Sequence, residues 1–406
     1  MLHTVYGEIF SIEQACRRRP GRSSMSSAVS GLPIAPALLA SVVAAQAIGG
    51  ASSNAAPIFV GALIDGAGFD EVSVGLIESA ELCFLAAATV ALSNWVATRS
   101  RWRLAAVGAC VAIAGHAASS FTSEFGALLV SRAIAGIGEG AVFAAGNAAV
   151  ASAREPDRLY GAAAVIGGLG SVGLLVLLPY ATVPFGPAGG YWSLAALTLG
   201  LLPLLLFLPD APAQVQTQTS SAPNRKLGMI GLLGVFTYAV GQGAVWAFTE
   251  RIGVQAGLEG HEVGENLGVA MLFGMLGAAS ASALGTRVGR SIPLGAGVLV
   301  QASAVAMLVT APDPAQYQLA LMGWAFSFFF CLPFLMGVMA SLDPAGRWAA
   351  AAAGLEIGAN GLGPVIGGAV LGFSGYGALG GLAVLTGFVA LGLMLYVIRA
   401  AGRTEP

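Results

Sequence analysis

Long apolar runs, interrupted only by short polar breaks, dominate this sequence. Of its 406 residues, 56% are hydrophobic and only 9% are charged, whereas a soluble domain carries about 25% charged residues. So few charges cannot cover a surface that faces water, but lipid as the surrounding solvent removes that requirement. The 58 glycines agree, because small residues let helix backbones approach closely in a bilayer. We therefore expect an all-α membrane protein that crosses the bilayer many times.

A spanning helix needs roughly 20 apolar residues, and cutting the chain at its polar or Pro/Gly-rich breaks gives twelve such segments. They are 36–63, 73–97, 103–121, 126–151, 159–181, 189–208, 228–252, 264–285, 292–310, 316–340, 348–371 and 377–398. A polar stretch after the sixth segment divides the set into halves. The predicted domains are a polar head, a six-helix bundle, a polar loop, a second six-helix bundle and a short tail, at 1–30, 31–208, 209–226, 227–399 and 400–406.

The positive charges predict the orientation of the chain in the membrane. With the N-terminus in the cytoplasm, cytoplasmic segments hold 16 of the 18 Lys and Arg residues; the exceptions are Arg132 and Arg251. The outer loops carry acids instead, namely Asp65, Asp70, Glu71, Glu124, Glu259, Glu262 and Asp313. We therefore predict a protein of the cytoplasmic (inner) membrane, with both termini and the loop 209–226 in the cytoplasm.

The two halves of the sequence repeat one another. The segment 67–70 (AGFD) recurs 189 residues later as 256–259 (AGLE), and Arg158 corresponds to Arg347 at the same offset. Six spans, a loop and six similar spans form the two-lobed plan of alternating-access transporters.

Two motifs carry a resemblance to the major facilitator superfamily. The turn 285–290 (GTRVGR) resembles the cytoplasmic signature loop of that family, although the usual acid is absent, and residues 94–103 form a more degenerate first copy. The resemblance implies a cytoplasmic gate role for Arg99, Arg101, Arg287 and Arg290. Met25 precedes a more usual N-terminus for a transporter, so that residues 1–24 are either part of the polar head or an artefact of start-site assignment.

The fourth segment, with 132–140 reading RAIAGIGEG, is similar to the arginine–glycine pattern of the same family, and in particular of its anion–cation symporter branch. That resemblance implies organic-anion binding at Arg132 and proton coupling at Glu139. The glycine–proline run 361–368 resembles a motif of the family's antiporters, but it lies in the eleventh segment. There it predicts a helix bend and close packing.

Ionisable side chains inside a membrane cost roughly 2.5–3.5 kcal/mol each, so the few that this chain places there are informative. Glu139 lies near the middle of its segment, and Arg132 lies seven residues earlier on nearly the same helix face. An acid buried near a cation changes its protonation when the conformation changes, as proton coupling requires. The alternative is a static ion pair or an interhelical hydrogen bond.

Two further pairs of polar residues share helix faces. Glu78 and Glu81 are three residues apart, and we expect them either to share one proton or to lie in a hydrated outer vestibule without a specific role. Glu356 and Asn360 are four residues apart, which indicates either a central binding site or an interhelical polar contact.

The seventh segment has a stripe of aromatic and hydrogen-bonding side chains, as pockets for small organic molecules do. It consists of Tyr238, Gln242, Trp246 and Glu250. The first segment has Gln46, Gly50 and Asn54 at the same spacing. Because the first and seventh spans line the central cavity in the resembled fold, these faces are binding candidates. We expect a structural role for Arg251 and a packing role for His116.

The leading hypothesis is a secondary active transporter of a small organic solute, driven by protons. Arg132 favours an organic anion, whereas the aromatic faces and the Glu-rich spans favour the alternative of an exporter of lipophilic or cationic drugs. A further alternative, a sensor or intramembrane enzyme, needs an output domain or a clustered catalytic constellation, and the sequence shows neither. We expect no cofactor, because the sequence has no Walker motif, and no metal, because its Cys and His residues are scattered. The expected partners are the substrate, protons and lipid, without nucleic acid, and the protein is expected to be a monomer.

Overall fold

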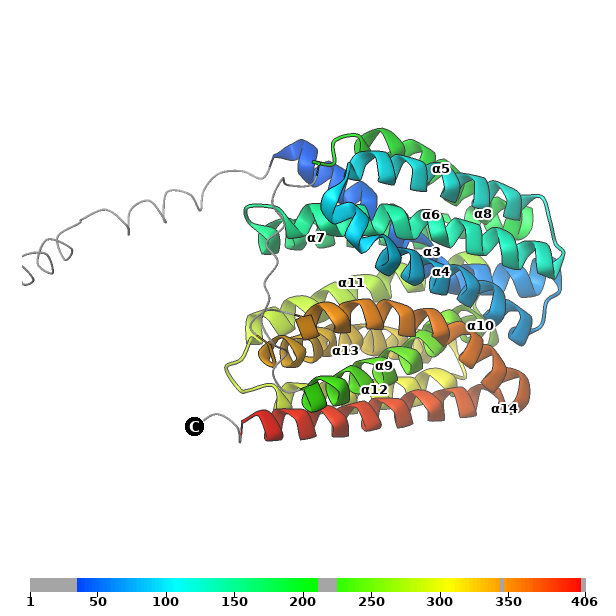
Figure 1. The fold of residues 1–406 in the computed structure, drawn as a ribbon. Coiled ribbons are helices and arrows are strands. Elements are labelled where there is room, and N and C mark those ends of the chain that lie inside the picture. Colours follow the sequence, from blue (N-terminus) through cyan, green and yellow to red (C-terminus); the bar gives the residue numbers. More distant parts are fainter. Residues whose placement is uncertain (1–34, 211–224, 344–346, 403–406) are drawn as a thin grey trace, which may run out of the picture. The chain divides into compact units, whose positions relative to one another are not determined.

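The structure is a computed structural model that describes residues 35–210, 225–343 and 347–402. In these ranges the regular secondary structure is entirely α-helical (Figure 1). The helices are α3 (Pro36–Ala67), α4 (Glu71–Thr98), α5 (Arg101–Ser120), α6 (Phe125–Ala151), α7 (Pro156–Leu177), α8 (Pro179–Leu205), α9 (Arg225–Ala247), α10 (Thr249–Gln255), α11 (Gly260–Leu284), α12 (Ser291–Val309), α13 (Pro314–Ser341) and α14 (Arg347–Ala401).

Eleven of these helices are long and apolar enough to cross a membrane, and the last of them crosses twice. The 55 residues of α14 would extend over about 80 Å as one straight helix, far beyond a hydrocarbon core of about 30 Å. The helix folds back at Gly375 (φ 74°, ψ −177°), as Figure 1 shows. Counting both parts of α14, the described chain has the twelve spans that the sequence predicts.

The predicted start of the sixth segment, residue 189, differs from the structure. Helix α8 begins at Pro179, because the last turns of the fifth span run on into the sixth across a break at Gly186 (φ 61°, ψ −160°). Gly186 and Gly375 are 189 residues apart, and so are Gly68 (φ 73°) and Gly257 (φ 97°). The two halves therefore turn their backbones at equivalent positions, which agrees with the predicted repeat.

An alanine at Gly375 is expected to lower the free energy of unfolding by about 1–3 kcal/mol, because this backbone conformation is almost restricted to glycine. The matched control is Gly381→Ala, which lies inside a helix with open space around it and is expected to be neutral or slightly stabilising. Thermal unfolding of both variants in detergent checks this. Equal destabilisation by the two changes would contradict the conformational explanation.

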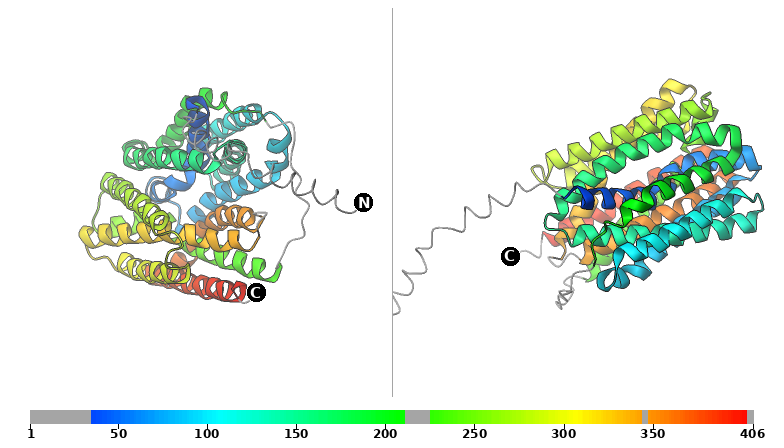
Figure 2. Two further views of the ribbon diagram at one scale, coloured as in Figure 1. Left: turned by 90° about the vertical axis from the view of Figure 1, so that its left-hand side faces the viewer. Right: turned by 90° about the horizontal axis from the view of Figure 1, so that it is seen from above.

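The spans form two six-helix bundles within the compact unit that begins at Ala37. In the first bundle α6 packs against both α4 and α5; in the second, α14 packs against α9 and α12, and α13 packs against α11 and α12. The bundles contact each other through α4 with α14 and through α7 with α11. Figure 2 shows the two groups of helices along their axes. The predicted head 1–30 and most of the loop 209–226 and of the tail 400–406 lie outside the described residues, and the predicted domain boundaries stay predictions.

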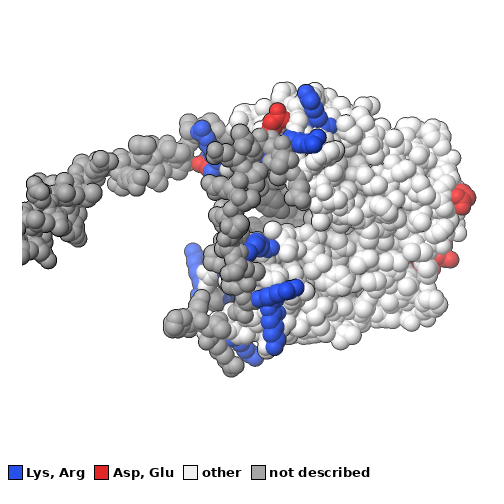
Figure 3. Space-filling view, in the orientation of Figure 1, with Lys and Arg blue, Asp and Glu red and all other residues white. Residues whose placement is uncertain are grey.

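Charged residues are separated between the two ends of the spans (Figure 3). We define the basic end as the one with Arg99, Arg101, Arg154, Arg158, Arg225, Lys226, Arg287, Arg290, Arg347 and Arg399. The acidic end is the opposite one, with Asp65, Asp70, Glu71, Glu124, Glu259, Glu262 and Asp313. A nearly uncharged band lies between them on the face that Figure 3 shows.

Several residues of the acidic end are helix caps. The Asp70 carboxylate accepts a hydrogen bond from the Ser73 N–H at 2.7 Å, and the Glu124 carboxylate accepts from two backbone N–H groups at the start of α6. These bonds lower the pKa of both carboxyl groups, because they stabilise the charged form. A negative charge there is also favourable to the helix dipole. Capping is thus one reason why the loops of this end carry acids.

Candidate functional site

Close packing around α6 brings buried charges together. The run Gly136–Gly140 has glycine at alternate positions, and a Cβ at Gly136 or Gly140 would collide with the α4 backbone at Glu81 or Leu85. A Cβ at the glycine between them would collide with α5 at Ala112. Because these positions lack side chains, α6 approaches both neighbouring helices and sets its polar side chains against theirs.

The strongest contact in this region is a buried ion pair between α6 and α4. Arg132 is completely buried, and Glu81 is 1% exposed. The Arg132 Nε donates to Glu81 Oε2 at 3.1 Å, and its Nη2 donates to Oε1. The guanidinium also lies over the ring of Tyr191, 4.5 Å from its centroid. A two-pronged contact of this kind fixes both partners in orientation as well as in charge.

His116 and Ser52 link this ion pair to Glu139. The Arg132 Nη1 lies 3.1 Å from His116 Nδ1, and His116 Nε2 lies 3.2 Å from Glu139 Oε1. Because a guanidinium only donates, Nδ1 accepts, and the neutral ring carries its proton on Nε2, towards Glu139. The Ser52 hydroxyl is 2.7 Å from Glu139 Oε1 and 3.0 Å from Glu81 Oε1, and its single proton serves one of them at a time.

We call Ser52, Glu78, Glu81, His116, Arg132 and Glu139 the buried charge network. It holds three carboxyl groups, each 1% exposed, and one guanidinium. One guanidinium compensates one carboxylate, and the two remaining negative charges would cost several kcal/mol each in this dry interior. We therefore expect protons on the remaining carboxyl groups. The ligand atoms of Glu81, His116 and Glu139 lie within 4.8 Å of one another. Arg132 already contacts two of these residues, however, and its charge would repel a metal cation, so the donor set suits protons better.

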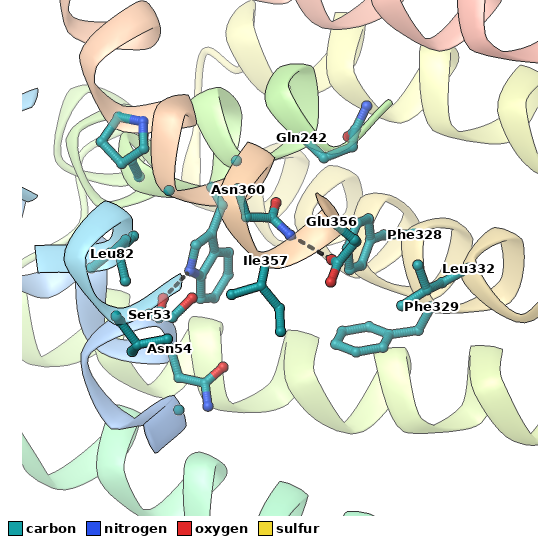
Figure 4. Close-up of a pocket in the computed structure, with 18 of the residues that line it drawn as sticks. Ser53, Asn54, Leu82, Gln242, Phe328, Phe329, Leu332, Glu356, Ile357 and Asn360 are labelled. Atoms are coloured by element: carbon teal, nitrogen blue, oxygen red, sulfur yellow. Dashed lines mark hydrogen bonds between the residues drawn. The ribbon is translucent and has the colours of Figure 1, made fainter. Parts of the chain in front are cut away.

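A separate central cavity of about 250 Å³ lies between the two bundles. Figure 4 shows a close-up of its lining, to which α3, α4, α6, α9, α11, α13 and α14 contribute. The lining side chains with aromatic or polar groups are Ser53, Asn54, Phe143, Gln242, Trp246, Trp324, Phe328, Phe329, Glu356 and Asn360.

One wall of this cavity is a ladder of aromatic rings. Trp246 and Trp324 stack with centroids 5.7 Å apart, and Trp324 and Phe328 stack at 5.9 Å. The indole N–H of Trp324 donates to Gln242 Oε1 at 2.8 Å, and that of Trp246 donates to the Ser53 carbonyl of the other bundle at 2.9 Å. Both indoles are therefore held in orientation by a hydrogen bond as well as by stacking.

The polar side of the cavity is formed by α14 and α3. The Asn360 amide donates to the Glu356 carboxylate, and the Asn54 amide donates to Ser171 Oγ of α7 at 2.9 Å. Glu356 and Asn360 lie close together in Figure 4. Glu356 and Asn360 thus both line the cavity and form a hydrogen bond within α14.

The structure places the candidate residues in two groups and leaves some in neither. Asn54, Gln242, Trp246, Glu356 and Asn360 line the cavity, whereas Arg132, Glu139, Glu78 and Glu81 belong to the buried charge network. Glu78 and Glu81 are both 1% exposed, so neither lies in a hydrated vestibule in this conformation, and the choice between a shared proton and a vestibule stays a prediction. Gln46 and Tyr238 are not part of the lining; Tyr238 is buried and stacks on Phe328 from behind it.

At the ends of the spans, the predicted charged residues make contacts of different kinds. Arg251 donates to Asp65 in the other bundle at 2.8 and 2.6 Å, and to the neighbouring Glu250 at 2.6 Å. This agrees with a structural role for Arg251. The gate arginines lie at the basic end, where Arg101 is buried and donates to the Val96 carbonyl and to Ser152. Arg99 lies over the Trp95 ring, Arg287 is exposed and Arg290 is half-buried. Their gate role stays a prediction.

Sequence reasoning missed several residues that the structure brings to these sites, among them His116, Ser52, Trp324 and Phe328. His116 was expected to be a packing residue, but it lies between Arg132 and Glu139. Ser52 is one of several small polar residues in its span and carries no distinctive signal. Trp324 and Phe328 belong to an aromatic-rich run in the tenth span; such a run indicates packing as readily as a binding wall.

The network and the cavity share two helices. Ser52 of α3 faces the network, while the next residue, Ser53, lines the cavity. Glu81 of α4 is in the network, while Leu82 lines the cavity. A rotation of either helix therefore changes both environments together.

Twelve spans in two six-helix bundles around a central cavity are the two-lobed plan of secondary transporters. The sequence matches the family model of the Major Facilitator Superfamily over residues 38–347. The chain belongs to this superfamily: it is a multi-pass membrane protein and a transporter, and not an enzyme, as the sequence predicts.

Solved structures share the fold at low sequence identity. A mutant of the nucleoside transporter NupG aligns with a TM-score of 0.70 and 13% identity, covering 89% of this chain and 99% of that one. A D-xylose-proton symporter aligns at 0.69 and 16%, covering 87% and 95%. The human organic anion transporter MFSD10 (TETRAN) aligns at 0.61 and 17%, covering 88% and 100%. A search of the curated proteins gave no match.

Proposed function

We propose that this protein is a proton-coupled secondary transporter of a small organic solute, which binds in the central cavity. The observation that carries the proposal is the buried charge network, in which three buried carboxyl groups are accompanied by a single guanidinium, immediately behind the cavity wall. This excess of carboxyl groups over positive charges is neutral only when protons are bound. A change of helix packing alters how strongly those protons are held. The likeness to a D-xylose-proton symporter is compatible with this mechanism.

Within the network, we assign the mobile proton to Glu139. Glu81 is fixed by the two-pronged contact with Arg132, whereas Glu139 contacts the neutral groups Ser52 and His116 and has one oxygen without a hydrogen-bond partner in the described structure. When α3 moves against α6, Glu139 loses Ser52 and its affinity for a proton changes. This step links the proton to the helix that also lines the cavity.

The two ends of the protein are proposed to face different compartments. By the rule that cytoplasmic loops carry the excess of Lys and Arg, the basic end and both termini face the cytoplasm and the membrane is the inner one. The acidic end then faces outward, and it is closed here by contacts between the bundles. Arg251 pairs with Asp65, and the Val365 N–H donates to Ser79 Oγ at 2.9 Å. Reporter fusions at the C-terminus and in the loop 209–226 test this orientation.

Replacing Asp65 by asparagine is expected to increase the outward-open population up to about fivefold. Asp65 is largely exposed (66% of its side chain), so the ion pair that it forms with Arg251 contributes no more than about 1 kcal/mol to closure. Spin labels at Ser123 and Thr310, one at the acidic end of each bundle, report the distance between the bundles, with Glu265→Gln as the control. An unchanged distance distribution would show that this contact does not hold the end closed.

The organic anion expected from Arg132 has less support than the general proposal. The Arg132 guanidinium is bound to Glu81 and does not line the cavity. The proposed function is therefore tested first with compounds of every charge. A thermal-shift screen of metabolites and drugs identifies ligands, because a bound ligand stabilises the native state. Ligands are then tested for accumulation in proteoliposomes under an imposed pH gradient. If no ligand accumulates, the proposed proton coupling is wrong.

A further inference from the structure

The charge of the central cavity is unbalanced. Among the described residues that line it, Glu356 is the only ionisable one. One of its oxygens accepts from Asn360, and no Lys, Arg or His of the described chain lies within ion-pair distance of it. A carboxylate in a mostly apolar cavity without a positive partner is costly, and a positively charged ligand would supply that partner.

Four of the six side chains that bring hydrogen-bond donors to the cavity lining already donate to other groups. The indole N–H groups of Trp246 and Trp324 donate to protein oxygens, and so do the side-chain amides of Asn54 and Asn360. A ligand anion would therefore meet no cation, and only the Ser53 hydroxyl, the Gln242 amide and the second N–H of Asn54 and of Asn360 would be left to bind it. Acceptors are in better supply, because the carboxylate of Glu356 retains lone pairs.

The aromatic wall suits the same ligand charge. Trp246, Trp324 and Phe328 stack in sequence, and Phe329 stands at 85° to Phe328 with centroids 5.1 Å apart. The face of an aromatic ring carries negative charge density and attracts cations, tryptophan most strongly. The ladder also offers a flat apolar surface for a ring or an aliphatic body.

We infer that the central cavity takes an organic cation with an aromatic or aliphatic body, with its positive group at Glu356 and its body on the Trp246–Trp324–Phe328 ladder. This inference rests on the proposed transport function and names the substrate class of its binding site. Figure 4 shows Glu356 beside Phe328, so that one ligand can reach both features.

Three benzyl compounds of similar size but different charge test the inference by binding to the purified full-length protein. They are benzyltrimethylammonium (positive), benzyl methyl sulfone (neutral) and phenylmethanesulfonate (negative). We expect the cation to bind about tenfold more tightly than the sulfone, because cation–π and carboxylate contacts contribute at least that factor when desolvated. The anion is expected to bind most weakly.

Glu356→Gln keeps the size of the side chain and an oxygen for Asn360 but removes the charge. This variant is expected to lose the tenfold preference for the cation while retaining the affinity for the sulfone, which also shows that it is folded. The matched control is Glu265→Gln, an exposed position on α11 outside the cavity, and it should keep the preference.

Three results of the binding experiment would overturn the inference: equal binding of the cation and the sulfone, tighter binding of phenylmethanesulfonate, or an unchanged cation preference in Glu356→Gln. The proposed transport function fails in a different experiment, the accumulation assay under a pH gradient. A protein that accumulates an anion would therefore refute the cation site while leaving proton-coupled transport intact.

Discussion

Proton-driven accumulation of substrate is expected to disappear when Glu139 is replaced by glutamine. For one proton per substrate, a gradient of one pH unit supplies about 1.4 kcal/mol and supports about tenfold accumulation; in the variant the ratio should fall to about one. Glutamine keeps an acceptor for Ser52 and His116 but cannot release a proton. Exchange of labelled for unlabelled substrate, which needs no net proton movement, should continue. Proteoliposomes with an imposed pH gradient measure both the accumulation ratio and the exchange rate.

The control for this experiment is again Glu265→Gln, which removes an exposed carboxylate far from the network and should accumulate substrate as the unaltered protein does. Accumulation by Glu139→Gln at the unaltered level would refute the assignment of the mobile proton to Glu139. If both exchange and accumulation were lost, the equivalent experiment with Glu139→Asp would separate a structural role from a protonation role, because aspartate restores only the latter.

Removal of the Arg132 guanidinium is expected to be the most destabilising single change in the first bundle. Arg132→Met leaves Glu81 buried without its cation, and breaking a buried pair in this way costs about 3–5 kcal/mol. Replacing both partners, with Arg132→Met and Glu81→Leu together, should recover most of that loss, since apolar side chains of similar size suit a dry interior. Chemical unfolding in detergent measures the three free energies.

Arg287→Met serves as the control for that series, because Arg287 is exposed and its removal should change stability by less than about 0.5 kcal/mol. An Arg132→Met protein as stable as the unaltered one would mean that Glu81 carries no charge in the native state. A double variant no more stable than the single one would mean that the cost comes from lost packing, for instance against Tyr191, and not from the orphaned carboxylate.

The course of the chain could be predicted from the sequence because hydropathy and length decide which segments enter a bilayer. The spans, their number and the repeat between the halves follow from that local signal. Gly186 lies inside the predicted break between the fifth and sixth segments, but the helix that crosses this break could not be predicted, because a bend inside an apolar run changes neither property. The family, and with it the function of a transporter, followed from the fourth segment and the GTRVGR turn.

The binding candidates were predicted only in part, and helix geometry explains which ones. A step of four residues overshoots one turn of 3.6 residues by about 40°, so a stripe at this spacing winds slowly around its helix. In the stripe of the seventh span, Gln242 and Trp246 line the cavity, whereas Tyr238, one turn earlier, does not. Glu250 is also outside the lining, because α9 ends at Ala247 and Glu250 belongs to α10. A short pair such as Glu356 and Asn360 stays on one face, and both members line the cavity.

The partners within the buried charge network could not be predicted, because the sequence does not give the register between neighbouring helices. Arg132 shares a helix face with Glu139, yet the carboxylate that it binds belongs to Glu81 on α4. That pairing depends on how closely α6 packs against α4 and α5. The glycines of the segment Gly136–Gly140 allow this close packing but do not specify its register. His116 joins them through the same register.

Adjacent residues of α3 contact the two regions: the Ser52 hydroxyl donates to a protonatable acid, and the Ser53 backbone carbonyl accepts from the indole of Trp246. If substrate binding shifts α3, the affinity of Glu139 for its proton changes. Because coupled binding equilibria are reciprocal, protonation must then change the substrate affinity by the same factor. The dissociation constant should consequently vary with pH even when the protein is held at equilibrium in detergent, with no membrane to separate two compartments and no turnover.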